Sequence, residues 1–76
     1  PFNPATTIEY QLPKETRISL KVFNMLGQEV ATLAEGEQSA GYYSVQWNAS
    51  SVSSGVYIYR LQSKEFVRTN KMILMK

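Results

Sequence analysis

The sequence predicts an all-β fold, a small antiparallel β-sandwich of six to seven strands. Segments of alternating apolar and polar residues recur about every ten residues, separated by clusters of Gly, Pro, Asn and Ser. No segment predicts a long helix, and no apolar run approaches the roughly 18 residues that span a membrane. With 76 residues, the chain is one domain with a marginal core, because a chain this short buries only about 60–70% of its unfolded surface.

Residues 1–5 are predicted to be the end of a linker, and residues 6–76 to be the domain itself. Pro4 disfavours the α conformation at Asn3, and two prolines within this segment resist regular strand pairing. Phe2 is large and apolar, so we expect it to plug the mouth of the sandwich. Because the chain begins without Met or a signal peptide, we interpret it as a fragment of a longer protein.

The first strand is predicted at residues 6–12. Ile8, Tyr10 and Leu12 alternate there with polar residues, so that one face is buried and the other is wet. Pro13 ends the strand because proline cannot donate to a β-ladder.

The second strand is predicted at residues 16–23, with Ile18, Leu20 and Val22 on its inner face. Residues 24–27 follow, with Asn in the first position and Gly in the fourth. This pattern is typical of a type I turn that leaves the glycine in a left-handed conformation. The sequence therefore predicts a hairpin that returns through a third strand.

The third strand is predicted at residues 28–34, with Val30 and Leu33 inward. A short helix is the alternative there, because Glu, Ala and Leu favour helices, but the return of the hairpin is the preferred interpretation. The polar residues 35–41 contain several turn-forming residues, and they predict a loop that ends at Gly41.

The fourth strand is predicted at residues 42–48. Tyr43, Val45 and Trp47 occupy alternate positions, so they are expected to share the inner face. Trp47 is the only tryptophan of the chain and is expected in the core. Small polar residues predict a loop over 48–54.

The fifth strand, predicted at residues 55–62, is the densest run of β-favouring residues. The side chains of Tyr57, Tyr59 and Leu61 fall on one face, and apolar Val56 and Ile58 fall on the other. A strand that is apolar on both faces indicates a position inside a sheet rather than at its rim. We therefore expect the other segments to pack around this strand.

The sixth strand is predicted at residues 66–75, after a turn at Ser-Lys-Glu. Met72 and Leu74 fall on one face, and Ile73 and Met75 fall on the other. The first pair is expected to close the core.

Arg60 and Arg68 stand on either side of this last turn. We expect them to form ion pairs with Glu9 or Glu65. Exposed pairs of this kind contribute only about 0–1 kcal/mol, so they carry no argument for stability.

The composition argues against catalysis and against cofactor or metal binding. The chain has no His and no Cys, and all six acidic residues are Glu, so the usual general base, the usual zinc ligands and clustered Asp are missing. The serines of residues 50–54 have no base to activate them. A net charge of +2 is too small to indicate nucleic acid as a partner. One binding alternative stays open, a sugar-stacking platform with Tyr42 and Phe23 as its exposed members.

Five segments resemble the C-terminal sorting domains of the type IX (Por) secretion system, type A, in the order in which that family has them. They cover most of the chain, and together they are more specific than any one of them. The segments are PFNPATTIEYQLP at 1–13, VFNMLGQEVATL at 22–33, AGYYSVQWN at 40–48, SGVYIYRL at 54–61 and KMILMK at 71–76.

This resemblance implies an Ig-like β-sandwich that serves as a non-catalytic sorting signal. The implied partners are the type IX secretion machinery, a sortase-like outer-membrane peptidase and cargo domains N-terminal to it in the same chain. The implied location is the outer-membrane surface or the medium, reached through the periplasm of a Gram-negative bacterium. The alternatives are an Ig-like structural spacer, a carbohydrate-binding accessory module and the similar Ig-like domain of flagellar hook-capping proteins.

The last strand is the expected recognition element. If it lies at a sheet edge, its unpaired backbone groups can add to a partner's sheet, and a weak dimer through such edges is the alternative. The residues expected to be recognised are Lys71, Met72, Ile73, Leu74, Met75 and Lys76. The residues expected to act only through turns and core are Gly27, Gly41, Trp47, Gly55, Tyr57 and Tyr59.

Overall fold

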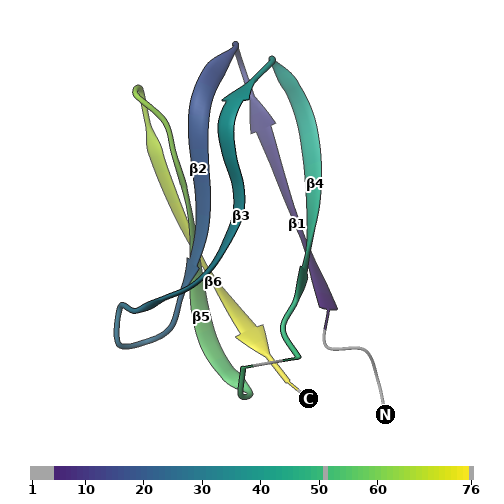
Figure 1. Cartoon of the computed structure of the whole chain (residues 1–76), viewed down its shortest axis with the longest axis vertical. Coiled ribbons are helices and arrows are strands. Elements are labelled where there is room, and N and C mark those ends of the chain that lie inside the picture. Colours follow the sequence, from purple (N-terminus) through teal and green to yellow (C-terminus); the bar gives the residue numbers. More distant parts are fainter. Residues whose placement is uncertain (1–4, 51, 76) are drawn as a thin grey trace.

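The computed structural model describes residues 5–50 and 52–75, which form two antiparallel β-sheets packed face to face (Figure 1). Within these ranges there is no helix. The predicted all-β sandwich is confirmed, with six strands. The strands are β1 (Ala5–Leu12), β2 (Thr16–Phe23), β3 (Glu29–Gln38), β4 (Gly41–Asn48), β5 (Gly55–Gln62) and β6 (Val67–Leu74).

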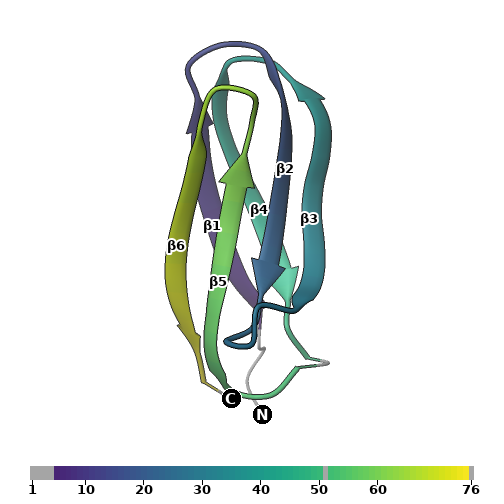
Figure 2. The same ribbon diagram turned by 90° about the vertical axis from the view of Figure 1, so that its left-hand side faces the viewer.

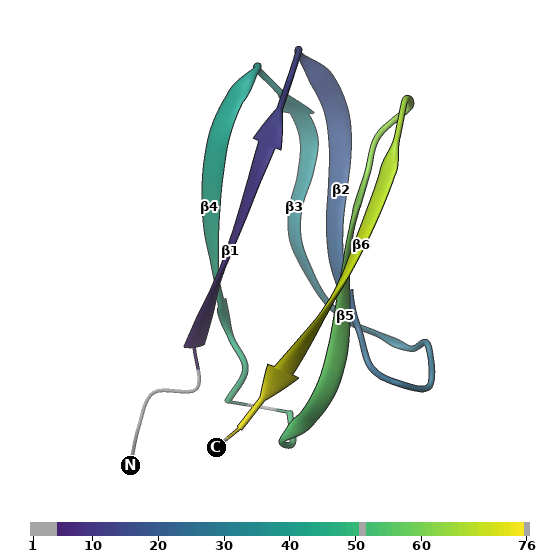
Figure 3. The same ribbon diagram turned by 180° about the vertical axis from the view of Figure 1, so that it is seen from behind.

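The two sheets differ in size. β1 and β4 form a two-stranded sheet, and the other strands form a four-stranded sheet in the order β3-β2-β5-β6. β1 pairs with β4 along its whole length, from Ala5 opposite Asn48 to Leu12 opposite Gly41. Figure 2 looks onto the four-stranded sheet, with β6 and β3 at its two edges. Figure 3 is the view opposite to Figure 1, with β1 and β4 on one side and the larger sheet on the other. The sandwich is therefore a larger sheet covered by a β-ribbon.

The core lies between the sheets and is built from the alternate residues of each strand that point inward. In β2 every second residue is buried, beginning with Thr16, because successive side chains of a strand point to opposite faces. One group of buried residues consists of Ile8, Leu12, Ile18, Leu20 and Leu61. A second group packs at the end of the sandwich where β4 and β6 end, and it includes Trp47 and Leu74. The largest fully buried side chains are Ile8, Leu12, Ile18, Leu20 and Val22.

β5 lies inside the four-stranded sheet, as its apolar residues predict. It pairs with β2 on one side and with β6 on the other. Tyr57 and Leu61 are buried on the inner face, whereas Val56 and Ile58 are half-buried on the outer face. The strand therefore packs against the core with one face and contributes half-buried apolar residues to the outer face of its own sheet.

β3 extends to Gln38, so the third strand predicted over 28–34 is too short and the loop predicted over 35–41 is wrong. The ladder with β2 continues through this segment, with Glu37 opposite Arg17. Polar residues are tolerated there because β3 is an edge strand with one face toward solvent, and both glutamates of the segment are exposed. The helix considered for the start of this segment does not form.

The first described strand begins, and the last one ends, at the same end of the sandwich (Figure 1). The loop between β4 and β5 lies at this end too, since Asn48 pairs with Ala5 and Gly55 pairs with Leu74. The expected plug by Phe2 lies outside the described residues. The division into a linker and a domain stays a prediction.

Candidate functional site

The candidate site is β6, the last strand and one edge of the four-stranded sheet. It pairs with β5 from Val67 to Leu74, and no strand of the described chain lies on its other side. Hydrogen bonds of an antiparallel strand alternate between its two sides, so this edge presents backbone N–H and C=O groups to solvent. The condition set for a recognition strand, a position at a sheet edge, is met.

The two faces of β6 have different surroundings. Leu74 is only 7% exposed, and Met72 packs against both groups of buried residues. Ile73 is 69% exposed, and Met75, just after the strand, is 76% exposed. Lys71 is exposed as well. One face thus anchors the strand in the core, while the other offers apolar and cationic side chains to solvent.

The expected recognition set is therefore divided by the fold. Lys71, Ile73 and Met75 are accessible, whereas Leu74 is buried and Met72 is half-buried. Lys76 lies outside the described residues. A partner that approaches from solvent can touch the first three side chains directly, and the buried leucine holds them in place.

Trp47 and Tyr57 form the support beneath the end of β6. Their ring centroids are 5.5 Å apart and their planes meet at 73°, an edge-to-face arrangement that aromatic pairs prefer. Leu74 belongs to the same buried group, and Tyr59 packs against it. These residues touch the inner face of the strand and leave its outer face free.

A repeated local motif starts the two strands that supply these rings. Gly41 and Gly55 have φ angles of +145° and +154°. A residue with a side chain would be strained in this backbone conformation. Two residues after each glycine a tyrosine hydroxyl reaches back to a backbone carbonyl: Tyr43 donates to Ser39 O and Tyr57 to Ser53 O, both at 2.7 Å. Sequence reasoning missed this repeat, although the spacing Ser-x-Gly-x-Tyr occurs at both places.

The turn between β2 and β3 has the predicted form. The N–H of Gly27 donates to the carbonyl of Asn24 at 3.0 Å, and Gly27 has a left-handed φ of +83°. The Asn24 side-chain carbonyl accepts from the N–H groups of Leu26 and Gln28. The asparagine therefore closes the turn with its backbone and its side chain together.

The structure does not bring the two candidate sugar-stacking residues together. Tyr42 is 83% exposed on the outer face of the β1–β4 sheet. Phe23 lies on the outer face of the four-stranded sheet, where the guanidinium of Arg60 stands 4.7 Å above its ring. A shared platform would need both rings on one surface, so the pair cannot form one.

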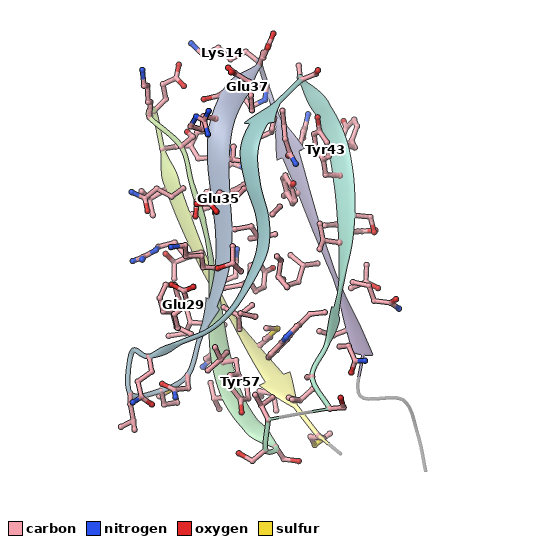
Figure 4. The ribbon with its side chains drawn as sticks, viewed as in Figure 1. Lys14, Glu29, Glu35, Glu37, Tyr43 and Tyr57 are labelled. Carbon is pink, nitrogen blue, oxygen red and sulfur yellow. The ribbon has the colours of Figure 1, made fainter. Side chains whose placement is uncertain are left out.

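A stacked tyrosine pair was not anticipated from the sequence. The rings of Tyr10 and Tyr43 lie 5.1 Å apart and nearly parallel (interplanar angle 12°), and the Tyr10 hydroxyl donates to Gln38 Oε1 at 2.7 Å. Burial raises the pKa of Tyr10. The pair lines an open hollow of about 490 Å³ that Arg68 also borders. Figure 4 shows Tyr43 and Tyr57 near opposite ends of the sandwich, so this hollow lies away from the end of β6.

The ion pairs differ from those expected. Arg60 and Arg68 lie over the rings of Phe23 and Phe66, so the predicted pairing with Glu9 or Glu65 is wrong. Flat guanidinium groups stack well on aromatic faces, and each arginine has such a ring beside it.

The glutamates pair with lysines instead. Lys14 pairs with Glu65, and Lys21 pairs with Glu29 at 3.4 Å. The Lys14 ammonium lowers the pKa of Glu65, and a hydrogen bond from Thr32 together with one from Lys21 lowers the pKa of Glu29. The first pair is exposed and the second is partly exposed, so their role in stability is small.

The described residues offer neither a metal site nor a membrane-spanning helix. Residues 5–50 and 52–75 hold no group of three or more carboxylates that could bind a metal ion. In the same ranges no helix is long and apolar enough to cross a membrane.

A known protein family matches nearly the whole chain. The family model described as secretion system C-terminal sorting domain matches residues 1–75. No curated protein and no solved structure matches the chain. The matched range includes all six strands and the candidate site on β6.

Proposed function

The chain belongs to the family of secretion system C-terminal sorting domains, and from this membership we propose which part of the fold is recognised. As a member of that family it is a C-terminal sorting signal for type IX secretion, which takes a protein across the outer membrane to the cell surface or the medium. The secretion machinery is therefore its partner. The recognised element is proposed to be the end of β6 with residues 71–76.

The position of β6 carries this proposal. A sorting signal has to be folded and readable at once, and β6 is anchored by Leu74 on one face while Ile73 and Met75 are exposed on the other. Large apolar side chains that stay exposed beside each other often mark an interaction surface. Because the strand is also a sheet edge, a partner can engage its backbone and its side chains together.

The rest of the route is proposed from the family. Cargo domains precede this chain in the same polypeptide, and the polypeptide reaches the outer membrane through the periplasm of a Gram-negative bacterium. A sortase-like outer-membrane peptidase then removes the domain. We assign no catalytic role to the chain itself, since the family is non-catalytic and the sequence contains neither His nor Cys.

Export of a reporter protein tests the proposal. The chain is fused behind the reporter in a bacterium with a type IX system, and the reporter is measured outside the cells. The double variant Ile73→Ser, Met75→Ser should lose export and keep its fold, because both side chains point to solvent. Point variants are sharper than deletion of residues 71–76, which would also remove Leu74 from the core.

Val67→Ser is the matched control, because Val67 is an exposed apolar residue (54%) at the other end of the same strand. The control should be exported like the wild type. Normal export of the double variant would show that the end of β6 is not what the machinery reads.

A further inference from the structure

The free edge of β6 is the more regular of the two edges of the four-stranded sheet. Its ladder with β5 runs from Val67 to Leu74 without a register shift. The ladder of the other edge strand, β3, shifts register at two places in its pairing with β2. Bulges of this kind hinder the addition of a further strand, whereas a regular edge accepts one. The β6 edge is therefore the better template for strand addition.

This edge carries positive charge with no acidic neighbour in its own sheet. β6 contains Arg68 and Lys71 and no Asp or Glu. The residues opposite them on β5 are Leu61 and Ile58. Neither ion pair of the described residues includes these two cations. The charge of Lys71 thus remains available to whatever lies along the free edge, while Arg68 lies over the ring of Phe66.

The outer face of the sheet beside β6 adds further positive charge. Arg60 of β5 stands opposite Thr69 of β6, so cations of these two strands share this face. Opposite charges on directly paired residues stabilise a ladder, whereas like charges destabilise it. An incoming strand that carries carboxylates would therefore be favoured.

A second copy of the chain is a poor occupant of this edge. Two copies could pair antiparallel through their β6 edges, so that their outer faces form one continuous face. A twofold axis at Lys71 then places that lysine directly opposite the same lysine of the other copy. A twofold axis at Asn70 places the same two lysines diagonally, still within reach of each other. Both registers bring the two Lys71 side chains together.

We propose that β6 pairs with an extended, acidic segment of the secretion machinery. This inference rests on the proposed function, and it adds the chemical character of the partner segment that pairs with β6. A carboxylate of the segment stands opposite Lys71, and an apolar side chain two positions along stands opposite the exposed Ile73, because alternate residues of a strand share a face. The partner's backbone completes the ladder, and its charge pattern sets the register.

A photoreactive residue on each edge tests the binding mode in the exporting cell, with the chain fused to its reporter. One probe replaces Thr69 on the outer face of β6, and the control probe replaces Thr32 on the opposite edge strand β3. The Thr69 probe should crosslink to an extended segment of one partner protein that contains Asp or Glu, and the Thr32 probe should not reach that segment.

Charge reversal tests the complementarity. Lys71→Glu should reduce the yield of this crosslink about twofold to fivefold, as expected for one cross-strand charge pair. Reversing the acidic residue of the crosslinked segment to Lys should restore the yield of the Lys71→Glu variant. Lys71 is exposed, so neither change disturbs the core.

The remaining outcomes separate the two proposals. A crosslink between two copies of the chain, a crosslink to a segment without acidic residues, or full export and crosslinking of Lys71→Glu would overturn the acidic-strand inference alone. Normal export of the Ile73→Ser, Met75→Ser variant, with no crosslink from the Thr69 probe, would overturn the proposed recognition of β6 and the inference with it.

Discussion

Ile73 and Leu74 are consecutive residues whose side chains lie on opposite faces of the four-stranded sheet. Leu74 is 7% exposed and packs in one group with Trp47 and Tyr57, whereas Ile73 is 69% exposed. Because a strand alternates its faces residue by residue, folding and recognition can depend on neighbouring residues without conflict. Substitutions can therefore separate the two roles.

Leu74→Ala should lower the free energy of unfolding by about 2–4 kcal/mol, since it removes buried methyl groups and leaves a cavity. Ile73→Ala should change it by less than about 0.5 kcal/mol, because the side chain is largely in water. Urea unfolding of the two variants measures the difference. Equal losses would contradict the assignment of the two faces.

Tyr57→Phe should destabilise the domain by about 0.5–1.5 kcal/mol. It removes the hydroxyl that donates to the carbonyl of Ser53 at 2.7 Å, and it leaves a part-buried acceptor without its partner. Tyr42→Phe is the control, because Tyr42 is 83% exposed. Thermal unfolding should lower the Tm of the first variant only, and a similar decrease in the control would argue against a role for the hydrogen bond.

The pair of Lys14 and Glu65 should make a small, pH-dependent contribution to stability. Lys14 lowers the pKa of Glu65 below its ordinary value of 4.5. A carboxyl whose pKa is lower in the folded state stabilises the fold above the unfolded pKa, and this contribution is lost as the pH falls through the folded pKa. The difference in unfolding free energy between the wild type and Lys14→Gln should thus be full above about pH 4.5 and should shrink below it.

Urea unfolding at several pH values at low salt measures this difference, because salt screens exposed pairs. A difference that stays constant down to pH values at which Glu65 is protonated would show that Lys14 acts through packing rather than through charge.

Local sequence patterns predicted most of the strands and their faces. The bounds of β2 and β5 agree with the predicted ranges, and Asn24 to Gly27 forms the predicted turn. The exposed Ile73 and the buried Leu74 follow from alternation alone. These features depend on backbone geometry within a few residues, which neighbouring side chains are sufficient to set.

Features that depend on neighbours distant in sequence were not predicted. β3 continues through polar residues to Gln38 because β2 pairs with it there, and a polar edge strand resembles a loop when it is viewed without its partner. Arg60 lies on the ring of Phe23 because the pairing of β5 with β2 places that ring beneath it. The repeated Ser-x-Gly-x-Tyr motif could have been found in the sequence, but its hydrogen bonds appear only in the folded chain.

The sequence by itself determined the strands, most of the turns and the division of the last strand into a buried and an exposed face, since a two-residue alternation is a local property. It also determined the family, because the segments that resemble it stand in order along the chain. Only the tertiary structure decided that β1 covers the core by pairing with β4 and that β6 lies at a free edge. Strand order depends on which distant segments bury the most surface together, and local patterns encode only a part of it, such as the interior position of β5.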